Sequence, residues 1–257
     1  MRISAVLGWP VEHSKSPAMM NAAFAATGIA AEMIKIGVEP VHFAAKLREL
    51  RALPMLGASV TTPHKLAAHD ACDELTPAAR EIGAVNCLQL AGMKLIGHNT
   101  DAPGFVDAVT SAGLDLAGAH VVLLGAGGAA RAVAYGCREA GAIVEVAART
   151  PANVAWIAAR PWTALAGMFA HAQLVVDCMS AELGSDPLDV PLDALPTSSP
   201  VATLVYHAKT DLLERASARG HSILDGAAML LHQGARAFTL WTGVQAPLDA
   251  MAAALRA

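Results

Sequence analysis

Several features that define whole classes of protein are missing from this sequence. No uninterrupted apolar stretch approaches the roughly 18 to 20 residues that a membrane helix needs. The amino terminus reaches Glu12 and His13 before an apolar signal-peptide core could form. We therefore expect a cytoplasmic protein that has no membrane partner.

Charge of one sign is also scarce. The chain carries 18 Lys and Arg residues against 22 Asp and Glu residues, a formal net charge of -4, and its basic residues form no stripe interleaved with aromatics. A nucleic-acid-binding surface has to neutralise many phosphates and release their counterions. The sequence therefore predicts no nucleic-acid partner.

Cysteine is rare and widely spaced. The chain has 4 cysteines, no C-x-x-C pair and no histidines at the spacing of metal ligands. Zinc sites and disulfide frameworks normally show such pairs. We therefore expect reduced, mostly buried thiols and no metal site. The cysteines are Cys72, Cys87, Cys137 and Cys178.

The abundant residues are apolar. Hydrophobic residues make up 54% of the 257 positions and charged residues 16%, which is typical of a compact globular protein. Much of the apolar content is alanine, which favours helices. A chain of this length can form two modest domains, each with its own core.

Apolar strands and helical segments alternate through the first hundred residues. The runs ISAVLG, EMIKIGV and ASV are typical of strands, and helices are expected after Pro17, through AAKLREL and from Pro63. VNCLQL and KLIGHN flank Ala91-Gly92-Met93, which predicts a hairpin at the edge of the sheet. We predict a mainly parallel α/β domain over residues 1–101.

A second alternating series follows. It runs from HVVLLG through a helix to AIVEVA, QLVVD and ATLVY, and ends near SILDG, so residues 102–225 are expected to form a second parallel-sheet domain. Residues 226–257 show helical spacing and no strand pattern, and we expect these helices to pack on the first domain. The predicted fold class is α/β, with two parallel-sheet domains.

A glycine-rich loop opens the second domain. Gly125, Gly127 and Gly128 come directly after an apolar strand and before a helix, with Ala130 at the last small position of a G-x-G-x-x-[GA] fingerprint. Small residues let a pyrophosphate approach the backbone N–H groups at a helix start. A tight turn is the alternative for a glycine trio alone, but the order strand, loop and helix favours a Rossmann-type dinucleotide site. The predicted phosphate-binding residues are Gly125, Ala126, Gly127, Gly128 and Ala129.

The next strand indicates which dinucleotide binds. In AIVEVAART, Ala148 stands where NAD-binding proteins have an acid that holds the ribose 2'-hydroxyl, and Arg149 follows it. A guanidinium suits the 2'-phosphate of NADP, and the Thr150 hydroxyl adds a donor. Glu145 lies earlier on the strand and is expected to face away from the ribose. We therefore predict NADP as the cofactor.

Several motifs occur in order between residues 8 and 243. They are GWPVEHSKSP, VTTPHK, GAVNC, NTDAPGF, GAGGAARA, ART and MLLHQGARAFTLWTG. Together these motifs resemble the shikimate dehydrogenase family. The resemblance implies reversible, NADPH-dependent reduction of 3-dehydroshikimate to shikimate, with the substrate held between a substrate domain and an NADP-binding domain.

The resemblance also implies roles for individual residues. It makes Lys65 and Asp101 the catalytic pair. A ketone that accepts hydride becomes an alkoxide and needs a proton, which a lysine ammonium can donate while an aspartate orients it. The alternatives are a solvated lysine and an aspartate that caps a helix. The implied substrate-binding residues are Ser14, Ser16, Thr61, Asn86, Tyr206 and Gln233. Leu204 and Gly226 fall on the nicotinamide side.

The chain departs from the family pattern at a few places. Ser59 replaces an asparagine, VVDCMS replaces an I-N-A-T-type run, VYHAKTDLL lacks a proline, and no second basic residue follows Arg149-Thr150. These departures predict a divergent branch. They leave open a quinate/shikimate dehydrogenase with mixed use of NAD and NADP, or a cofactor-binding sensor of low activity. A monomer and a homodimer are both compatible with the sequence.

Overall fold

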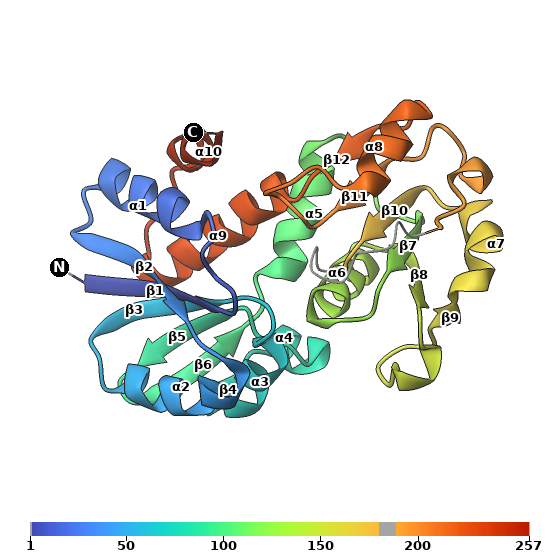
Figure 1. The fold of residues 1–257 in the computed structure, drawn as a ribbon. Coiled ribbons are helices and arrows are strands. Elements are labelled where there is room, and N and C mark those ends of the chain that lie inside the picture. The colour runs from blue at the N-terminus through green and yellow to red at the C-terminus, as the bar shows by residue number, and fades with distance from the viewer. Residues whose placement is uncertain (1, 180–188, 257) are drawn as a thin grey trace. The chain divides into compact units, whose positions relative to one another are not determined.

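The structure is a computed structural model that describes residues 2–179 and 189–256 (Figure 1). The chain divides into two compact units. Unit 1 comprises Met1–Gly104 and Leu230–Ala257, and unit 2 comprises Phe105–Met229. The divisions fall inside two helices, α5 (Asp101–Ser111) and α9 (Ala227–Thr242). Each unit contains its own sheet and its own core.

The sheet of unit 1 has six strands in the order β2-β1-β3-β5-β6-β4. The strand β1 pairs in parallel with β2 and β3, whereas β5 runs antiparallel to β3 and β6. The predicted hairpin around Gly92 is therefore present, but it does not form the edge, because the two-residue strand β4 pairs outside β6. A strand this short shows no alternation in the sequence. The strands are β1 (Arg2–Gly8), β2 (Ala31–Gly37), β3 (Met55–Val60), β4 (Glu74–Leu75), β5 (Cys87–Ala91) and β6 (Lys94–His98).

Helices pack on both faces of this sheet. One core joins Leu7, Val60 and Leu88 of the sheet to Phe43 of α2. Elsewhere in unit 1, the Phe24 ring of α1 packs against the Phe238 ring of α9, with ring centroids 5.5 Å apart. The helices are α1 (Ser16–Thr27), η1 (Pro40–His42), α2 (Phe43–Arg51), α3 (Lys65–Ala71), α4 (Pro77–Ile82) and α10 (Leu248–Arg256).

The helix α9 from Leu230 onward and the helix α10 belong to unit 1. The Trp241 indole of α9 donates a hydrogen bond to the Leu88 carbonyl of β5 at 3.0 Å. The helix α10 packs against α1, and Lys15 Nζ donates to the Leu255 carbonyl at 2.9 Å. These contacts connect α9 to the first sheet and α10 to α1.

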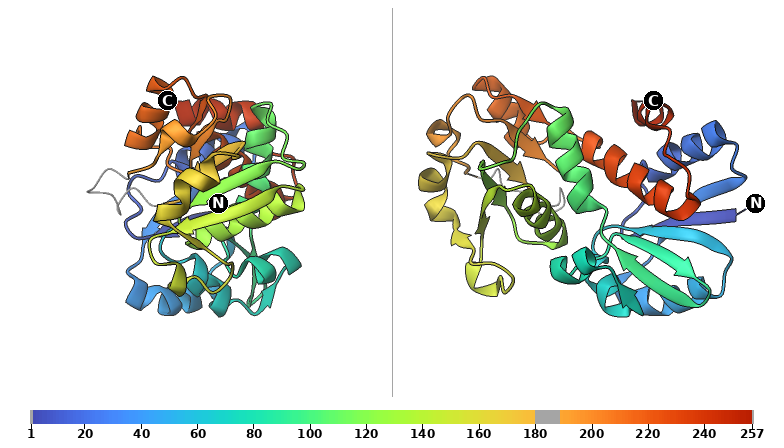
Figure 2. Two further views of the ribbon diagram at one scale, coloured as in Figure 1. Left: turned by 90° about the vertical axis from the view of Figure 1, so that its right-hand side faces the viewer. Right: turned by 180° about the vertical axis from the view of Figure 1, so that it is seen from behind.

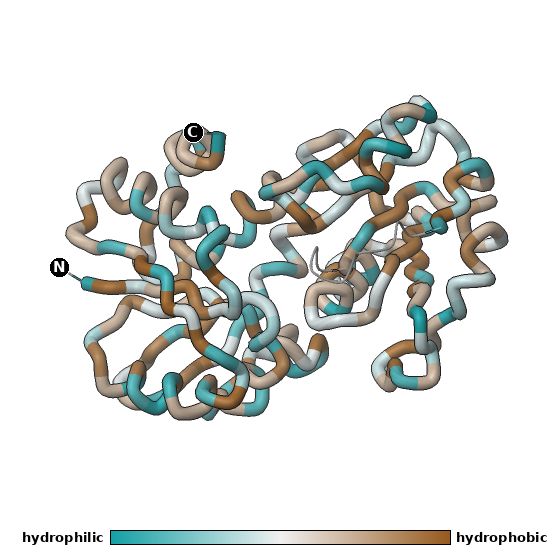
Figure 3. The backbone as a smooth tube through the Cα atoms, in the orientation of Figure 1, coloured by the Kyte–Doolittle hydropathy of each residue, from teal (hydrophilic) through white to brown (hydrophobic). Residues whose placement is uncertain are grey.

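The sheet of unit 2 is parallel throughout, in the order β12-β11-β10-β7-β8-β9. Side chains alternate along β7, because Val121 and Leu123 join one core and Val122 and Leu124 join the other. This double burial explains the continuous apolar runs along the strands (Figure 3). The strands are β7 (His120–Leu124), β8 (Ile143–Ala148), β9 (Arg160–Pro161), β10 (Leu174–Asp177), β11 (Val201–Thr203) and β12 (Ile223–Leu224).

The helices of unit 2 cover both faces of its sheet (Figure 2). Side chains of α5 and α6 complete the core on one face, and those of α7 and α8 complete the core on the other. The helices are α6 (Gly128–Glu139), η2 (Pro151–Asn153), η3 (Trp162–Ala164), α7 (Leu165–Phe169), η5 (Leu192–Ala194) and α8 (Asp211–Ala218). The two-residue strand β9 escaped prediction because it has no pattern of its own.

The thiols, the candidate metal ligands and the helix lengths can be assessed in residues 2–179 and 189–256. All four cysteines are free, and burial raises the pKa of the Cys72 thiol to about 11 and that of the Cys137 thiol to about 12. No group of three His, Cys, Asp or Glu side chains in residues 2–179 and 189–256 is placed to hold a metal ion. Every helix in those ranges is too short or too polar to cross a bilayer.

The start of α3 differs from the prediction. We expected a helix from Pro63, but α3 begins at Lys65, and Pro63 lies in the preceding turn after a cis peptide bond to Thr62. In this turn the His64 N–H donates to the Thr61 carbonyl at 2.9 Å. Pro63 therefore belongs to the turn that precedes α3, and Lys65 is the first residue of the helix.

A buried histidine fixes this helix start. The His64 side chain is only 1% exposed and stacks on Phe43, with ring centroids 4.3 Å apart and an interplanar angle of 9°. Its Nε2 lies 2.7 Å from the Val38 carbonyl oxygen, so this nitrogen donates. Burial lowers the pKa of the ring, and the bond to Val38 opposes that shift.

We predict that His64 makes the folded state sensitive to acid. Because the folded-state pKa lies below the unfolded value of 6.5, the unfolded chain takes up more protons as the pH falls below that value, and stability is lost. Urea unfolding at about pH 7.5 and about pH 5.5 measures this loss. His64→Phe keeps the ring stack and removes the titration, so it should lose less stability between the two conditions than the wild type. Equal losses in the two proteins would contradict the assignment.

Candidate active site

A buried ion pair joins α3 to α5 in unit 1. Lys65 Nζ lies 2.7 Å from Asp101 Oδ2, and the two side chains are 16% and 6% exposed. Each residue is the first of its helix, and each helix follows a strand of the same sheet, β3 and β6. The ends of two strands therefore bring together an ammonium and a carboxylate that are 36 residues apart in the sequence.

The side-chain amide of Asn86 fixes the other oxygen of this carboxylate. Its Nδ2 lies 2.9 Å from Asp101 Oδ1 and 2.9 Å from Thr100 Oγ1, and its Oδ1 accepts the Thr100 N–H at 2.7 Å. Asn86 is 3% exposed. The carboxylate is thus held by Lys65 on one oxygen and by Asn86 on the other, which leaves it little freedom to rotate.

Helix α9 completes the arrangement. Gln233 Oε1 lies 3.3 Å from Asn86 Nδ2, and Gln233 Nε2 donates to the Leu230 carbonyl of its own helix at 2.9 Å. A methyl group on Gly104 would lie 2.7 Å from the Gln233 backbone nitrogen, so only glycine lets α5 and α9 approach this closely. We call Lys65, Asn86, Thr100, Asp101 and Gln233 the Lys65–Asp101 cluster.

Two residues of this region escaped the sequence reasoning. Asn99 Oδ1 accepts the Ala102 N–H at 3.1 Å, and Asn99 Nδ2 donates to the Ala84 carbonyl at 2.9 Å. Asn99 therefore caps the start of α5, the role considered for Asp101, whose carboxylate bonds Lys65 and Asn86 instead. Thr100 is the second residue missed. Thr100 could have been noticed because it lies inside the N-T-D motif. The capping role of Asn99 could have been predicted because an asparagine commonly accepts the N–H of the residue three positions later, here Ala102.

The two predicted serines lie at the start of α1. Ser14 and Ser16 are each 6% exposed, and Ser14 Oγ accepts the Ser16 N–H at 3.3 Å. Within the described part of the chain they make no hydrogen bond to the Lys65–Asp101 cluster. Thr61 lies in the turn before α3, where its N–H donates to the Leu7 carbonyl of β1 at 2.9 Å. Unit 1 therefore contains Ser14, Ser16, Thr61, Asn86 and Gln233.

The glycine loop of unit 2 fits a pyrophosphate. It joins β7 to α6, whose 12 residues begin after Gly127, and the Ala126 carbonyl accepts the Trp156 indole N–H at 3.1 Å. Apart from the adjoining residues, no described atom lies within 4 Å of the position that a Gly127 side chain would take, so the space beside Gly127 is open. These N–H groups carry the positive end of the helix dipole, which favours an anion. The loop brings together Gly125, Ala126, Gly127, Gly128 and Ala129.

Arg149 and Thr150 follow β8 and lie at the same end of the parallel strands as the glycine loop, which follows β7. Both are exposed and follow directly after β8, which pairs with β7 so that Ala147 lies opposite Leu124. Glu145 is occupied elsewhere, because its carboxylate lies 3.2 Å from His171 Nε2 and 3.5 Å from Arg160. The guanidinium of Arg149 is therefore the charged group that follows this strand.

Asp177 occupies the carboxyl end of β10, which neighbours β7. It belongs to the run VVDCMS, whose last residue, Ser180, lies outside the described residues. The Asp177 side chain is buried, which raises the pKa of its carboxyl to about 6, although the Met179 N–H donates to it at 3.0 Å and opposes the shift. A carboxyl group therefore lies at the carboxyl end of β10, at the position of the asparagine in the I-N-A-T-type run.

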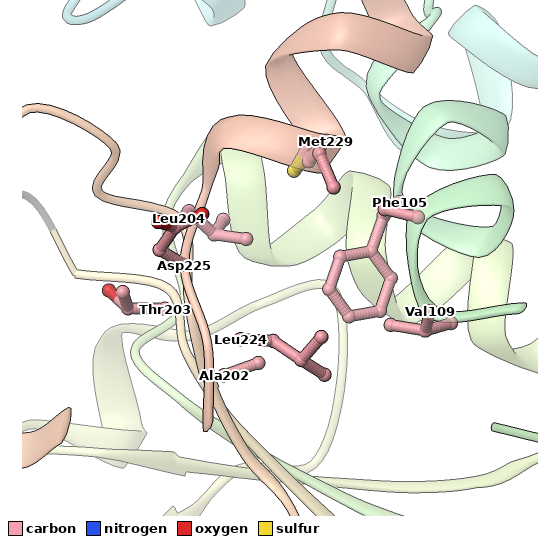
Figure 4. Close-up of a pocket in the computed structure, with 10 residues that line it drawn as sticks. Phe105, Val109, Ala202, Thr203, Leu204, Leu224, Asp225 and Met229 are labelled. Atoms are coloured by element: carbon pink, nitrogen blue, oxygen red, sulfur yellow. The ribbon is translucent and has the colours of Figure 1, made fainter. Parts of the chain in front are cut away.

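The predicted nicotinamide-side residues are neighbours in unit 2. A side chain on Gly226 would lie 2.2 Å from the Leu204 carbonyl oxygen, so this contact requires glycine. Leu204 also lines a small apolar pocket with Phe105 and Met229 (Figure 4). Tyr206 follows in the same unit, with its ring 5.5 Å from that of His207. Unit 1, which holds the other predicted substrate-binding residues, does not contain Tyr206.

Comparison with known proteins identifies relatives of the whole chain. Residues 6–88 match the model of the shikimate dehydrogenase substrate binding domain, and residues 226–256 match that of the shikimate 5'-dehydrogenase C-terminal domain. Shikimate dehydrogenase (NADP(+)) from Symbiobacterium thermophilum is 40% identical, over 97% of this chain and 92% of the relative. The protein of that name from Methanocella arvoryzae is also 40% identical, over 98% and 97%.

Solved structures agree with these sequence matches. Shikimate 5-dehydrogenase from Thermus thermophilus, in complex with NADP(H) and shikimate, superposes with a TM-score of 0.89 at 37% identity, covering 100% of this chain and 99% of that one. The 5-ketofructose reductase of a Gluconobacter strain gives a TM-score of 0.82 at 28% identity, covering 99% and 98%. This chain therefore belongs to the shikimate dehydrogenase family.

Proposed function

We propose that this protein is an NADP-dependent shikimate dehydrogenase, which reversibly reduces 3-dehydroshikimate to shikimate. The observation that carries the proposal is the buried pair of Lys65 and Asp101, held at 2.7 Å in unit 1. Family membership and a phosphate-binding loop followed by Arg149 in unit 2 support it. The relatives that carry the name of this activity align with this chain over 92% and 97% of their own length.

The chemistry that Lys65 supplies concerns the oxygen of the substrate ketone. When NADPH is bound it supplies a hydride to the carbonyl carbon, and the oxygen then develops negative charge. The Lys65 ammonium has three N–H donors, one of which points to Asp101 Oδ2. The remaining donors can bind the developing oxyanion, and the ammonium can then protonate it.

Asp101 acts on Lys65 by position and charge. Its Oδ2 accepts from Lys65, and its Oδ1 accepts from Asn86, so the carboxylate holds the ammonium in one orientation before the substrate binds. In the oxidation of shikimate the same pair works in reverse, because the group that donates the proton in one direction must accept it in the other. Neither step needs a metal ion.

Substrate and cofactor recognition is divided between residues of the two units. Short polar side chains suit a small acid with several hydroxyls. We assign Ser14, Ser16 and Tyr206 to its carboxylate, and Thr61, Asn86 and Gln233 to its ring hydroxyls. The cofactor is assigned to the residues Gly125, Ala126, Gly127, Gly128, Ala129, Arg149, Thr150, Leu204 and Gly226.

We expect initial rates with two acids and two cofactors to identify the reaction. Shikimate with NADP+ should give the highest kcat/KM, because Arg149 matches a 2'-phosphate and no acid stands at Ala148 for the NAD ribose. Higher kcat/KM for quinate with NAD+ would favour the mixed quinate/shikimate reading. Tight nucleotide binding without turnover of either acid would favour a sensor.

We also expect Lys65→Met to lower kcat by at least about a hundredfold, since general acid-base groups contribute on that scale. Asp101→Asn should lower kcat as well, because it removes the charge that orients the ammonium. Lys94→Met is the matched control: Lys94 pairs with Glu74 at 2.6 Å in the same unit, but this pair is 65% and 52% exposed. Circular dichroism confirms folding, and near-normal turnover in folded Lys65→Met would refute the role of Lys65.

A further inference from the structure

An indole lies against the phosphate-binding loop of unit 2. Trp156 Nε1 donates to the Ala126 carbonyl at 3.1 Å, and the residue is half-buried. Trp156 follows Arg149 and Thr150 by only a few residues, after the short helix η2. One ring therefore connects the loop after β7 with the segment after β8, the two segments that border the adenosine side of a Rossmann site.

A guanidinium lies over this indole. Arg131, the fourth residue of α6, places its guanidinium carbon 5.8 Å from the centre of the Trp156 ring. Its Nε is buried and has no hydrogen-bond partner among residues 2–179 and 189–256. No carboxylate in those ranges forms an ion pair with it, whereas Arg51 and Arg219 each pair with an aspartate. Arg131 is thus a cation without a carboxylate partner in those ranges, beside the glycine loop.

The cofactor that we propose carries more negative charge than Arg149 alone can balance. The 2'-phosphate of NADP is close to a dianion at neutral pH. No basic residue occurs in η2 (Pro151–Asn153), which follows directly after Arg149 and Thr150. A second guanidinium from another element would supply both the missing charge and further donors.

We propose that Arg131 is a specificity-determining residue for NADP, which binds the 2'-phosphate together with Arg149 while Trp156 positions its guanidinium. This inference rests on the proposed use of NADP. A competing role for Arg131 is to bind the pyrophosphate, which NAD and NADP share. The two roles differ in outcome, because only a contact with the 2'-phosphate discriminates between the nucleotides.

The test is isothermal titration of the full chain with NADP+, NAD+ and 2',5'-ADP, which carries the 2'-phosphate but no nicotinamide. Arg131→Gln should weaken NADP+ and 2',5'-ADP by about tenfold or more, and NAD+ by less than about twofold, as expected for a charge-assisted hydrogen bond to one phosphate. Arg138→Gln is the control, because Arg138 is an exposed cation in the last turn of the same helix.

Two further variants keep the test decisive. Arg131→Lys keeps the positive charge but lacks the planar guanidinium, so its NADP+ affinity should lie between those of the wild type and Arg131→Gln. This variant also provides a test if Arg131→Gln does not fold. Trp156→Leu should lose NADP+ affinity more than NAD+ affinity. Equal weakening of NADP+ and NAD+ by Arg131→Gln, or no weakening, would overturn this inference alone. A wild type that binds NAD+ as tightly as NADP+ would overturn the proposed cofactor as well.

Discussion

The contact on which the proposed chemistry depends is the buried ion pair between Lys65 and Asp101. Two charges removed from water are stable only when their remaining hydrogen-bonding capacity is met, and removal of one partner of such a pair typically destabilises a protein by about 3–5 kcal/mol. Asn86 meets part of that requirement by donating to Asp101 Oδ1. The cluster therefore has one preferred arrangement, in which an ammonium is oriented before any substrate arrives.

The architecture of unit 1 explains how that arrangement is reached. Lys65 and Asp101 each begin a helix that follows a strand of one sheet, and Asn86 immediately precedes β5, which lies between those two strands. Strand pairing thus fixes three side chains that are distant in sequence. Gln233 comes from α9, whose close approach depends on Gly104. Rigid elements of secondary structure, rather than long loops, position most of the site.

Much of this could be predicted from the sequence, but only where a local pattern exists. The alternating strands and the glycine loop have such patterns. The strands β4 and β9 have two residues each and show none. The contact of Trp156 with Ala126 and the stack of His64 on Phe43 join separate segments, and no spacing in the chain encodes them. The motifs indicated that Lys65 and Asp101 belong together, whereas the geometry of their hydrogen bonds required the fold.

The most direct measurement of the central claim is a double-mutant cycle in kcat/KM with shikimate and NADP+, using Lys65→Met, Asp101→Asn and the two combined. If the ammonium and the carboxylate act as one unit, the combined variant should be no slower than the slower single variant, within about twofold. Losses that multiply in the combined variant would show that the two side chains act independently, and would contradict a catalytic role for their ion pair.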